Sequence, residues 1–412
     1  MKNVHLYWID EHNSSKRNGI GTFRDMLLPR LGAMRGVTLT LISLNADGLD
    51  LELKRNESYA EISVPMIADG HWRTHGDLIW PVLSKYIPDR ENNVFMLNHS
   101  PCGAFVKSLK EMFSKSKITF TIHDQGWCTP LMGDGSALHD IMSGKHCPDS
   151  ISEETAEYVR DLCKRDREMY DMVDAVVCLS DSTDKVLKED YRLPTEKVHL
   201  IRNGYELTSR RRQNRLSARK ELGLRTDEEL LIFVGRPAKY KGIEPLLMAL
   251  EKVRAKHPMM RCLFTGMPGN LDSFWEKAGK IAANIVCIGQ VSHEELQKWY
   301  AAADVGIMAS YSEQCSYAAM EMMAASLTIV ASDGNGVRDM FTDGENAMVA
   351  KIGAVTDTEG YANELAAAID RALCTTAHKR RQFAVTNRQL LLDKFSADGM
   401  AGFYHALINS VI

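Results

Sequence analysis

Two glutamates separated by seven residues lie where a hydrophobic segment passes into a helical one. Glu313 follows the strand-like segment 304–308, and Glu321 lies further along among alanines and methionines. A carboxylate among apolar neighbours is costly to bury unless donors bind it, and a ribose diol offers two hydroxyl donors. Ser316 is a good N-cap residue, so we expect a helix to begin there, with the N–H groups of Cys315, Ser316 and Tyr317 available to phosphate oxygens. Two exposed surface glutamates are the alternative.

Two cationic residues stand earlier in the same half of the chain. Arg236 follows the apolar segment 229–234 directly after Gly235, and Lys241 precedes the next helix. Ligands of open α/β sheets bind at the carboxyl ends of the strands. A cation is unfavourable at a helix N-terminus unless an anion binds there. The pair is therefore predicted to neutralise a departing diphosphate, rather than to be two exposed surface charges.

A glycine pair, Gly19 and Gly21, follows the first apolar segment, and a helix is expected from about Thr22. A nicotinamide-binding loop would have a third glycine where Arg24 stands, and an acidic residue after strand 37–44, where Leu44 and Asn45 stand. The dinucleotide interpretation therefore fails. A loop that approaches a phosphate or an acceptor, and plain turn glycines, both stay open.

The elements that must position these residues alternate between short apolar strands and amphipathic helices. Strands that are apolar on both faces and separated by helices predict parallel sheets covered on both sides. The expected strands are 3–9, 37–44, 93–98, 117–122, 174–179, 197–201, 229–234, 260–265, 284–288, 304–308, 327–331 and 347–350. The expected helices include 152–171, 212–222, 243–256, 293–302, 316–325 and 360–373.

A polar, basic stretch at 202–222 divides the two strand–helix series. The 412 residues are therefore expected to form an N-terminal domain 1–205, a C-terminal domain 206–390 and a closing helix 391–412. The fold class is α/β, with two Rossmann-like parallel-sheet domains.

Composition narrows the classes of function and the compartment. A net charge of −4 gives no general attraction to nucleic acid. Nine scattered cysteines without CxxC pairs, no signal-type N-terminus and no long apolar run predict a cytoplasmic protein with reduced thiols. The segment 107–117 carries four lysines among apolar residues and suggests weak contact with the inner face of a membrane, although an ordinary exposed helix is favoured. No metal is expected, because the candidate ligands lack suitable spacing. They are His5, His12, His99, His146 and Cys147.

Together these pieces resemble the retaining glycosyltransferases of family 4, which have the GT-B fold. The resemblance rests on VGR and KYKG before the Glu-(seven residues)-Glu motif, on GIG at 19–21, and on His123-Asp124 after KITFTI. Further matching stretches are DAVVCLSDST, VHLIRNGYE, LFTGMPG and IVCIGQVSHEELQKWYAAADVGIMAS. The resemblance covers the whole chain and implies two domains facing across a cleft, with the C-terminal helix crossing back to the first. The stretch EQCSYAAMEMM resembles a Bacteroidales-type subgroup.

The resemblance implies roles residue by residue. Arg236 and Lys241 would bind the diphosphate, Glu321 would hold the ribose, and Glu313 would face the donor sugar. His123 would contact the sugar, although by itself the His-Asp pair would be a structural one. The remaining donor-binding positions implied are Gly19, Gly21, Gly235, Ile288, Gln290, Val291, Gln314, Cys315, Ser316 and Tyr317.

The activity implied is transfer, with retention, of a hexosyl group of the glucose, N-acetylglucosamine, galactose or mannose type. The donor would be a nucleotide-diphosphate sugar, a UDP-sugar favoured, and the acceptor a glycan, lipid-linked or peptide hydroxyl. Neither a cofactor nor a metal would be required. A non-catalytic partner subunit that binds nucleotide sugars is one alternative. An epimerase or a phosphorylase of the same fold is another; they would need several cleft carboxylates or a pyridoxal lysine, respectively.

Overall fold

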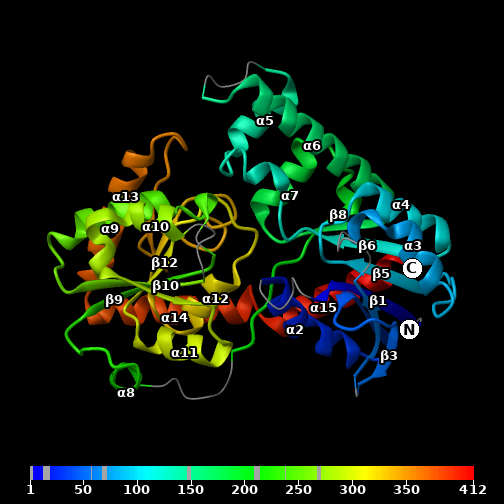
Figure 1. Ribbon diagram of the computed structural model, residues 1–412, viewed down its shortest axis with the longest axis horizontal. Helices are drawn as coiled ribbons and strands as arrows, with labels where there is room; N and C mark the ends of the chain where they lie inside the picture. The colour runs from blue at the N-terminus through cyan, green and yellow to red at the C-terminus, as the bar shows by residue number, and fades with distance from the viewer. Residues whose placement is uncertain are drawn as a thin grey trace. The chain divides into compact units, whose positions relative to one another are not determined.

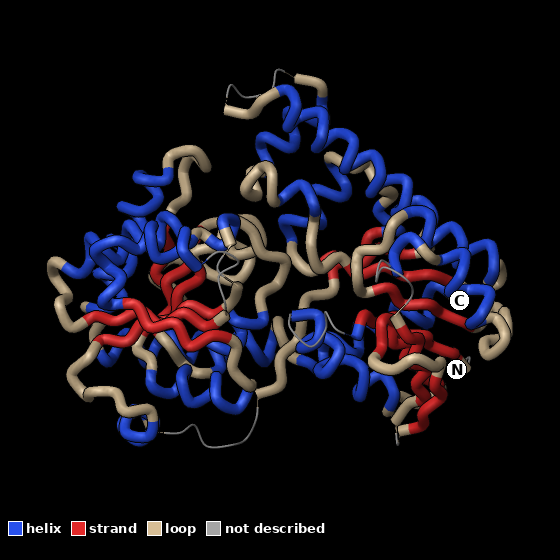
Figure 2. Tube along the Cα trace, viewed as in Figure 1, coloured by secondary structure: helices blue, strands red, loops and turns tan. Residues whose placement is uncertain are grey.

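The computed structural model describes residues 3–12, 19–56, 58–66, 72–145, 150–207, 214–236, 238–266 and 271–412. The chain divides into two compact units. Unit 1 comprises residues 1–127, 136–206 and 395–412, and unit 2 comprises residues 128–135 and 207–394. In each unit, parallel strands are covered by helices (Figure 2).

Unit 1 is built on an eight-stranded sheet in the order β3-β4-β2-β1-β5-β6-β7-β8. Neighbouring strands run parallel, except that β3 is antiparallel to β4. The strands are β1 (Val4–Glu11), β2 (Val37–Ala46), β3 (Glu52–Arg55), β4 (Ala60–Pro65), β5 (Asn93–Leu97), β6 (Lys117–Thr121), β7 (Ala175–Cys178) and β8 (Val198–Leu200). The sequence patterns predict neither β4 nor β3. Strand β3 is a charged edge strand whose four side chains are all exposed.

The helices of unit 1 pack on both faces of this sheet. Helices α3, α4 and α6 lie on one side, and α2 lies with the C-terminal helix α15 on the other (Figure 1). Tyr404 of α15 is fully buried and its hydroxyl lies 3.2 Å from Thr121 Oγ1 of β6. The helices are α2 (Gly19–Gly32), α3 (Gly76–Leu83), α4 (Gly103–Met112), α5 (Gly135–Ser143), α6 (Glu153–Met172), α7 (Asp181–Glu189) and α15 (Ala397–Val411).

Unit 2 is built on a six-stranded, wholly parallel sheet in the order β11-β10-β9-β12-β13-β14. Most residues of its strands are buried, as their apolar sequences predict, except in the edge strand β11, which is mostly half-buried. They are β9 (Glu229–Val234), β10 (Met260–Thr265), β11 (Ile285–Gly289), β12 (Val305–Met308), β13 (Thr328–Ser332) and β14 (Met348–Ala350).

The helices of unit 2 also form two layers. Figure 1 shows α9, α10 and α13 on one face of the sheet and α11, α12 and α14 on the other. They are α8 (Arg215–Glu221), α9 (Ile243–Arg254), α10 (Leu271–Ala278), α11 (His293–Ala302), α12 (Tyr317–Ala324), α13 (Thr358–Leu373) and α14 (Ala377–Asp393). Side-chain oxygens cap the N-termini of several helices, which fixes where those helices begin. The capping residues in unit 2 are Asn214, Ser292, Ser316, Asp357 and Thr376.

Two expected elements differ from the structure. Helix α2 begins at Gly19 rather than near Thr22, so the glycine pair lies in its first turn. In the segment 107–117, α4 ends at Met112, and Leu109 and Phe113 are buried in unit 1. These two side chains therefore do not form the exposed apolar face that membrane contact requires.

Across the described ranges, none of the helices is both long and apolar enough to cross a bilayer. Within the same ranges the cysteines are free thiols. Most of them are buried, as expected for reduced residues of a core; those with some exposure are Cys102, Cys287 and Cys374.

Candidate active site

The loops after β9, β10 and β11 meet through their backbones at the carboxyl edge of the unit 2 sheet. The Gly235 N–H donates to the Thr265 carbonyl at 3.4 Å, and the Gly266 N–H donates to the Gly289 carbonyl at 2.7 Å. A Cβ on Gly266 would lie only 2.7 Å from the Gly235 carbonyl oxygen, and φ at Gly266 is 93°. Glycine is thus required where these backbones touch. At Gly235 (φ 136°) an added Cβ would meet open space, so here the backbone angle alone favours glycine.

An ion pair joins the loop after β9 to the loop after β12. Lys241 Nζ lies 2.6 Å from Glu313 Oε1, and Ser310 Oγ donates to the same oxygen at 2.7 Å. The side chains of Lys241 and Glu313 are 20% and 12% exposed, so the pair is mostly shielded but still reachable from solvent. The two candidates that the sequence places 72 residues apart are therefore direct partners.

Close backbone packing fixes the position of Lys241. Gly242 is left-handed (φ 70°), and a Cβ there would lie 2.0 Å from the Ala309 carbonyl oxygen. The Tyr311 N–H donates to the Tyr240 carbonyl at 2.9 Å. Because β9 and β12 are neighbours in the sheet, these two loops run side by side at its edge.

A third loop supports Glu313 from the other side. The Glu313 N–H donates to the Asn335 carbonyl at 2.9 Å, and the Asn335 N–H donates to the Tyr311 carbonyl at 3.0 Å. Gly336 (φ 70°) packs so closely that a Cβ would lie 1.9 Å from the Glu313 carbonyl oxygen. The loop after β13 thus packs tightly against the Glu313 loop. The sequence motifs around the two glutamates do not predict this contact.

Glu321 is buried in the second turn of α12 and is only 6% exposed. The hydroxyl of Tyr300, a fully buried residue of α11, donates to Glu321 Oε2 at 2.9 Å. His293 Nδ1, at the start of α11, lies 3.8 Å from the other oxygen, Oε1, and the His293 side chain is 61% exposed. Burial raises the pKa of Glu321 to about 7, against the lowering effect of the Tyr300 hydrogen bond.

Helix α12 begins where the sequence predicts, directly after Ser316. Ser316 is its N-cap, and the Ser316 side chain accepts from the Ala319 N–H at 3.4 Å. Cys315 and Tyr317 are buried, whereas Gln314 and Ser316 are half-buried. The helix start therefore lies at the same edge of the sheet as Glu313.

The remaining unit 2 candidates lie along the same edge. Arg236 is exposed, and within the described ranges its side chain makes no hydrogen bond or ion pair. Ile288 is half-buried near the end of β11, and Gln290 and Val291 join β11 to the Ser292 cap of α11. His293 follows directly, so the segment 288–291 leads to the residue that faces the free oxygen of Glu321.

In unit 1, His123 lies at the carboxyl edge of its own sheet, just after β6. Its ring packs against Phe23 of α2 with the centroids 4.6 Å apart. His123 Nε2 is buried and, within the described ranges, has no hydrogen-bond partner. Burial, with a smaller effect from nearby His99, lowers the pKa of His123 to about 3, so the ring is neutral near pH 7. Gly21 is buried and Gly19 exposed in the first turn of α2.

Comparison with known proteins agrees with this architecture. Residues 214–389 match the family model described as Glycosyl transferases group 1, which covers less than half of the chain and lies within unit 2. Sucrose-phosphate synthase from Thermosynechococcus elongatus aligns over 99% of both chains with a TM-score of 0.73 and 18% identity. Anabaena Alr3699/HepE, in a complex with UDP and glucose, aligns over 99% of this chain and 100% of that one, with a TM-score of 0.65 and 14% identity. The chain has the GT-B fold.

A curated relative also aligns with much of this GT-B chain. Alpha-maltose-1-phosphate synthase of Mycolicibacterium smegmatis is 25% identical over 242 residues. The aligned region is 56% of this chain and spans 62% of the relative's own length.

Three residues that contact the candidate site residues are not predicted from the sequence. They are Tyr300, His293 and Asn335, which contact Glu321 or the Glu313 loop. His293 and Tyr300 lie two turns apart on one face of α11, a spacing that indicates a shared face but not what the face meets. Asn335 acts through its backbone, so its residue type carries no signal.

Proposed function

We propose that this protein is a retaining glycosyltransferase that moves a hexosyl group from a nucleotide-diphosphate sugar to a hydroxyl acceptor. The observation that carries the proposal is the Lys241–Glu313 ion pair at the carboxyl edge of the unit 2 sheet, where open α/β sheets bind ligands. The group 1 glycosyl transferase match over the same unit supports it. The likeness in fold to HepE, whose structure contains UDP and glucose, also supports it. This likeness favours a UDP-sugar as the donor.

In this proposal the diphosphate binds to Lys241, Arg236 and the N-terminal N–H groups of α12. Lys241 is already positioned by Glu313, and the exposed Arg236 guanidinium is available to the same diphosphate. Cations and helix N-termini stabilise the negative charge that develops on a leaving diphosphate. Glu313, beside the phosphates, would then face the donor sugar.

Glu321 would bind the ribose hydroxyls through the oxygen that Tyr300 does not occupy. One carboxylate oxygen accepts from Tyr300 and the other faces the exposed His293. The segment 288–291, which leads to His293, would lie against the base. Binding a diol needs the ionised carboxylate, and hydroxyl donors would offset the cost of ionising a buried acid.

The reaction itself would need positioning and charge stabilisation rather than a protein nucleophile. The acceptor oxygen forms a bond to the anomeric carbon on the face from which the diphosphate departs. The bond from that carbon to the phosphate oxygen breaks, and the departing phosphate takes the acceptor proton. Lys241 and Arg236 would stabilise the leaving group in place of a metal ion.

His123 would bind a sugar hydroxyl through Nε2. A neutral imidazole nitrogen that is buried without a partner is costly, and a hydroxyl group of a substrate would satisfy it. The acceptor would be a glycan, a lipid-linked sugar or a peptide. Free cysteines throughout the described chain suit work in the reducing cytoplasm.

Turnover of purified protein with a panel of UDP-, GDP- and dTDP-sugars tests the proposal. We expect nucleotide diphosphate release that depends on an added acceptor, and a product with the donor's anomeric configuration by NMR. Lys241→Ala should lower kcat by about 10²-fold, as loss of a charge-stabilising donor does. Lys239→Ala, an exposed lysine of the same turn, is the matched control and should keep full activity.

Other outcomes distinguish the alternatives. An epimer formed from a UDP-sugar alone would indicate an epimerase. Tight binding of a nucleotide sugar without transfer to any acceptor would indicate a non-catalytic partner subunit. Full activity in Lys241→Ala would contradict the assignment of the leaving-group site.

A further inference from the structure

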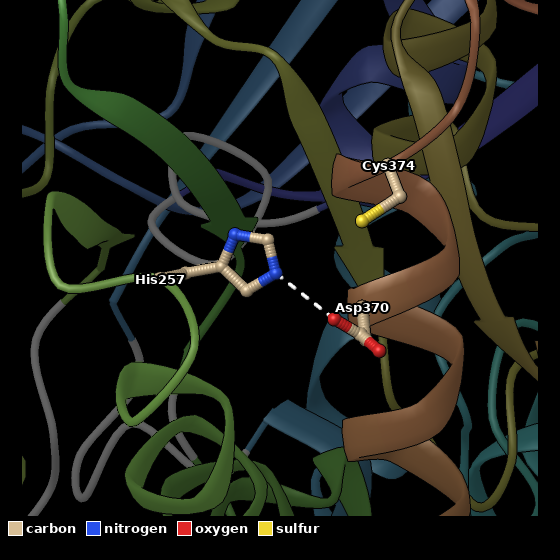
Figure 3. Close-up of side chains that lie close together, drawn as sticks. All are labelled: His257, Asp370 and Cys374. Atoms are coloured by element: carbon tan, nitrogen blue, oxygen red, sulfur yellow. Dashed lines mark hydrogen bonds and ion pairs between the residues drawn. The ribbon is translucent and has the colours of Figure 1, made fainter.

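A second cluster of chemically reactive side chains lies at the opposite, amino edge of the unit 2 sheet. His257 stands in the turn between α9 and β10, Asp370 lies in the last turn of α13, and Cys374 directly follows that helix. One ligand atom from each residue lies within 4.8 Å of the others. Figure 3 shows the imidazole, carboxylate and thiol grouped between the turn and the helix. Within the described ranges this is the one group of three or more such residues with this geometry.

The His257 ring is held in the orientation that metal sites use. Both carboxylate oxygens of Glu229, the first residue of β9, lie 3.0–3.1 Å from His257 Nδ1. Nε2 is thereby directed at Asp370 Oδ1, 2.9 Å away. A carboxylate that accepts from one imidazole nitrogen fixes the tautomer and leaves the other nitrogen to bind a metal. The His257 side chain is only 11% exposed, so little of the ring faces solvent.

The three ligand types select a metal. Asp370 and Cys374 are four residues apart and so share one face of the helix end. A nitrogen, oxygen and thiolate set suits Zn²⁺, whereas Mg²⁺ and Ca²⁺ take oxygen ligands. Zinc bond lengths of about 2.0–2.2 Å place a tetrahedral nitrogen–oxygen pair roughly 3.3–3.6 Å apart. The observed 2.9 Å between His257 Nε2 and Asp370 Oδ1 needs only a small adjustment.

A lysine also contacts Asp370, through the carboxylate oxygen that His257 does not contact. Lys256 Nζ lies 2.9 Å from Asp370 Oδ2, the oxygen that faces away from His257, and the Lys256 side chain is 71% exposed. Such an exposed pair contributes little, and it involves Oδ2 rather than the Oδ1 that His257 contacts. Cys374 is exposed, which leaves room for a water as fourth ligand.

We propose that His257, Asp370 and Cys374 bind a Zn²⁺ ion, with water in the fourth position. The site would tie the end of α13 to the turn before β10. It lies at the edge of the sheet opposite Lys241 and Glu313, so its role is to stabilise unit 2 and it does not depend on the proposed transferase activity. The sequence spacing places Asp370 and Cys374 on one helix face but does not bring in His257, which is 113 residues from Asp370.

Metal titration of the full chain tests the site. After chelator treatment and dialysis, Zn²⁺ should bind with a stoichiometry of one. At a hundred times its dissociation constant it should raise Tm by about 5–10 °C, as expected for a unit of this size. Co²⁺ should give an ultraviolet thiolate-to-cobalt charge-transfer band, which reports sulfur ligation directly.

Matched variants assign the ligands. Cys374→Ser should remove the cobalt band and weaken Zn²⁺ binding at least 10-fold, whereas Cys102→Ser, a partly exposed thiol in unit 1, should change neither. His257→Gln should lose the Zn²⁺-dependent rise in Tm. That rise is measured against the variant's own metal-free Tm, so lost hydrogen bonds to Glu229 do not enter it. An unchanged cobalt band in Cys374→Ser, an unchanged rise in His257→Gln, or no binding by the wild type would overturn the proposal.

Discussion

Replacing Glu321 with glutamine is predicted to stabilise the ligand-free protein at alkaline pH. Burial raises the pKa of Glu321 from its ordinary 4.5 to about 7, so the folded protein holds this proton more tightly than the unfolded chain. The stability that the protonated carboxyl contributes is complete below pH 4.5 and is lost as the pH rises through 7. At about 1.4 kcal/mol per pKa unit, the loss between pH 5 and pH 8 is about 2.5 kcal/mol.

Glutamine does not titrate, so Glu321→Gln avoids this loss. The amide keeps an acceptor for the Tyr300 hydroxyl and adds a donor on the side of His293. The difference in Tm between variant and wild type should therefore be about 5–10 °C larger at pH 8 than at pH 5, for cooperative unfolding of a unit the size of unit 2.

Differential scanning calorimetry across pH 5–8 measures this difference. Glu364→Gln, an exposed position on α13, is the control and should show a difference that does not change with pH. A constant difference in Glu321→Gln, or a variant that becomes relatively less stable as the pH rises, would refute the argument. Either result would mean that the buried carboxyl carries no desolvation cost.

Three further predictions concern the same site. In the wild type, the dissociation constant of UDP-glucose should rise about 30-fold from pH 8 to pH 5.5, because protonated Glu321 cannot accept from two hydroxyls. In Glu321→Gln, the dissociation constant measured by isothermal titration calorimetry should not change with pH. Tyr300→Phe should raise KM for the donor several-fold with a smaller change in kcat, since Tyr300 only orients Glu321; equal losses in both would argue against this positioning role. Gly336→Ala should lower Tm by several degrees and reduce kcat, because its Cβ would lie 1.9 Å from the Glu313 carbonyl oxygen; wild-type values in both measurements would show that the two loops are not rigidly packed.

Local patterns in the sequence are sufficient for much of the fold. Apolar strands alternating with helices predict two parallel-sheet units, and both sheets are present, with β3 as an antiparallel edge strand. The Ser316 cap, and a Glu321 buried more than a turn into its helix, follow from side-chain capping and apolar neighbours. The start of α2 at Gly19 does not, because glycine is a poor helix former and the segment favours a turn.

Sequence also indicates which residue types gather at the carboxyl edge of the unit 2 sheet, but not their pairing. Lys241 meets Glu313 because β9 and β12 are neighbours in the sheet, and strand order depends on packing between distant segments. Tyr300 reaches Glu321 because α11 and α12 cover the same face.

The cluster of His257, Asp370 and Cys374 shows most clearly which features the sequence determines and which depend on the tertiary structure. Helical periodicity places Asp370 and Cys374 on one face, since residues four apart follow a local repeat. That His257 joins them depends on how the turn before β10 and the end of α13 lie against the sheet. Helix propensity, side-chain capping and the alternation of strands with helices depend on residues close together in the sequence, so they can be predicted from it. A hydrogen bond between distant segments forms only when the whole core has packed.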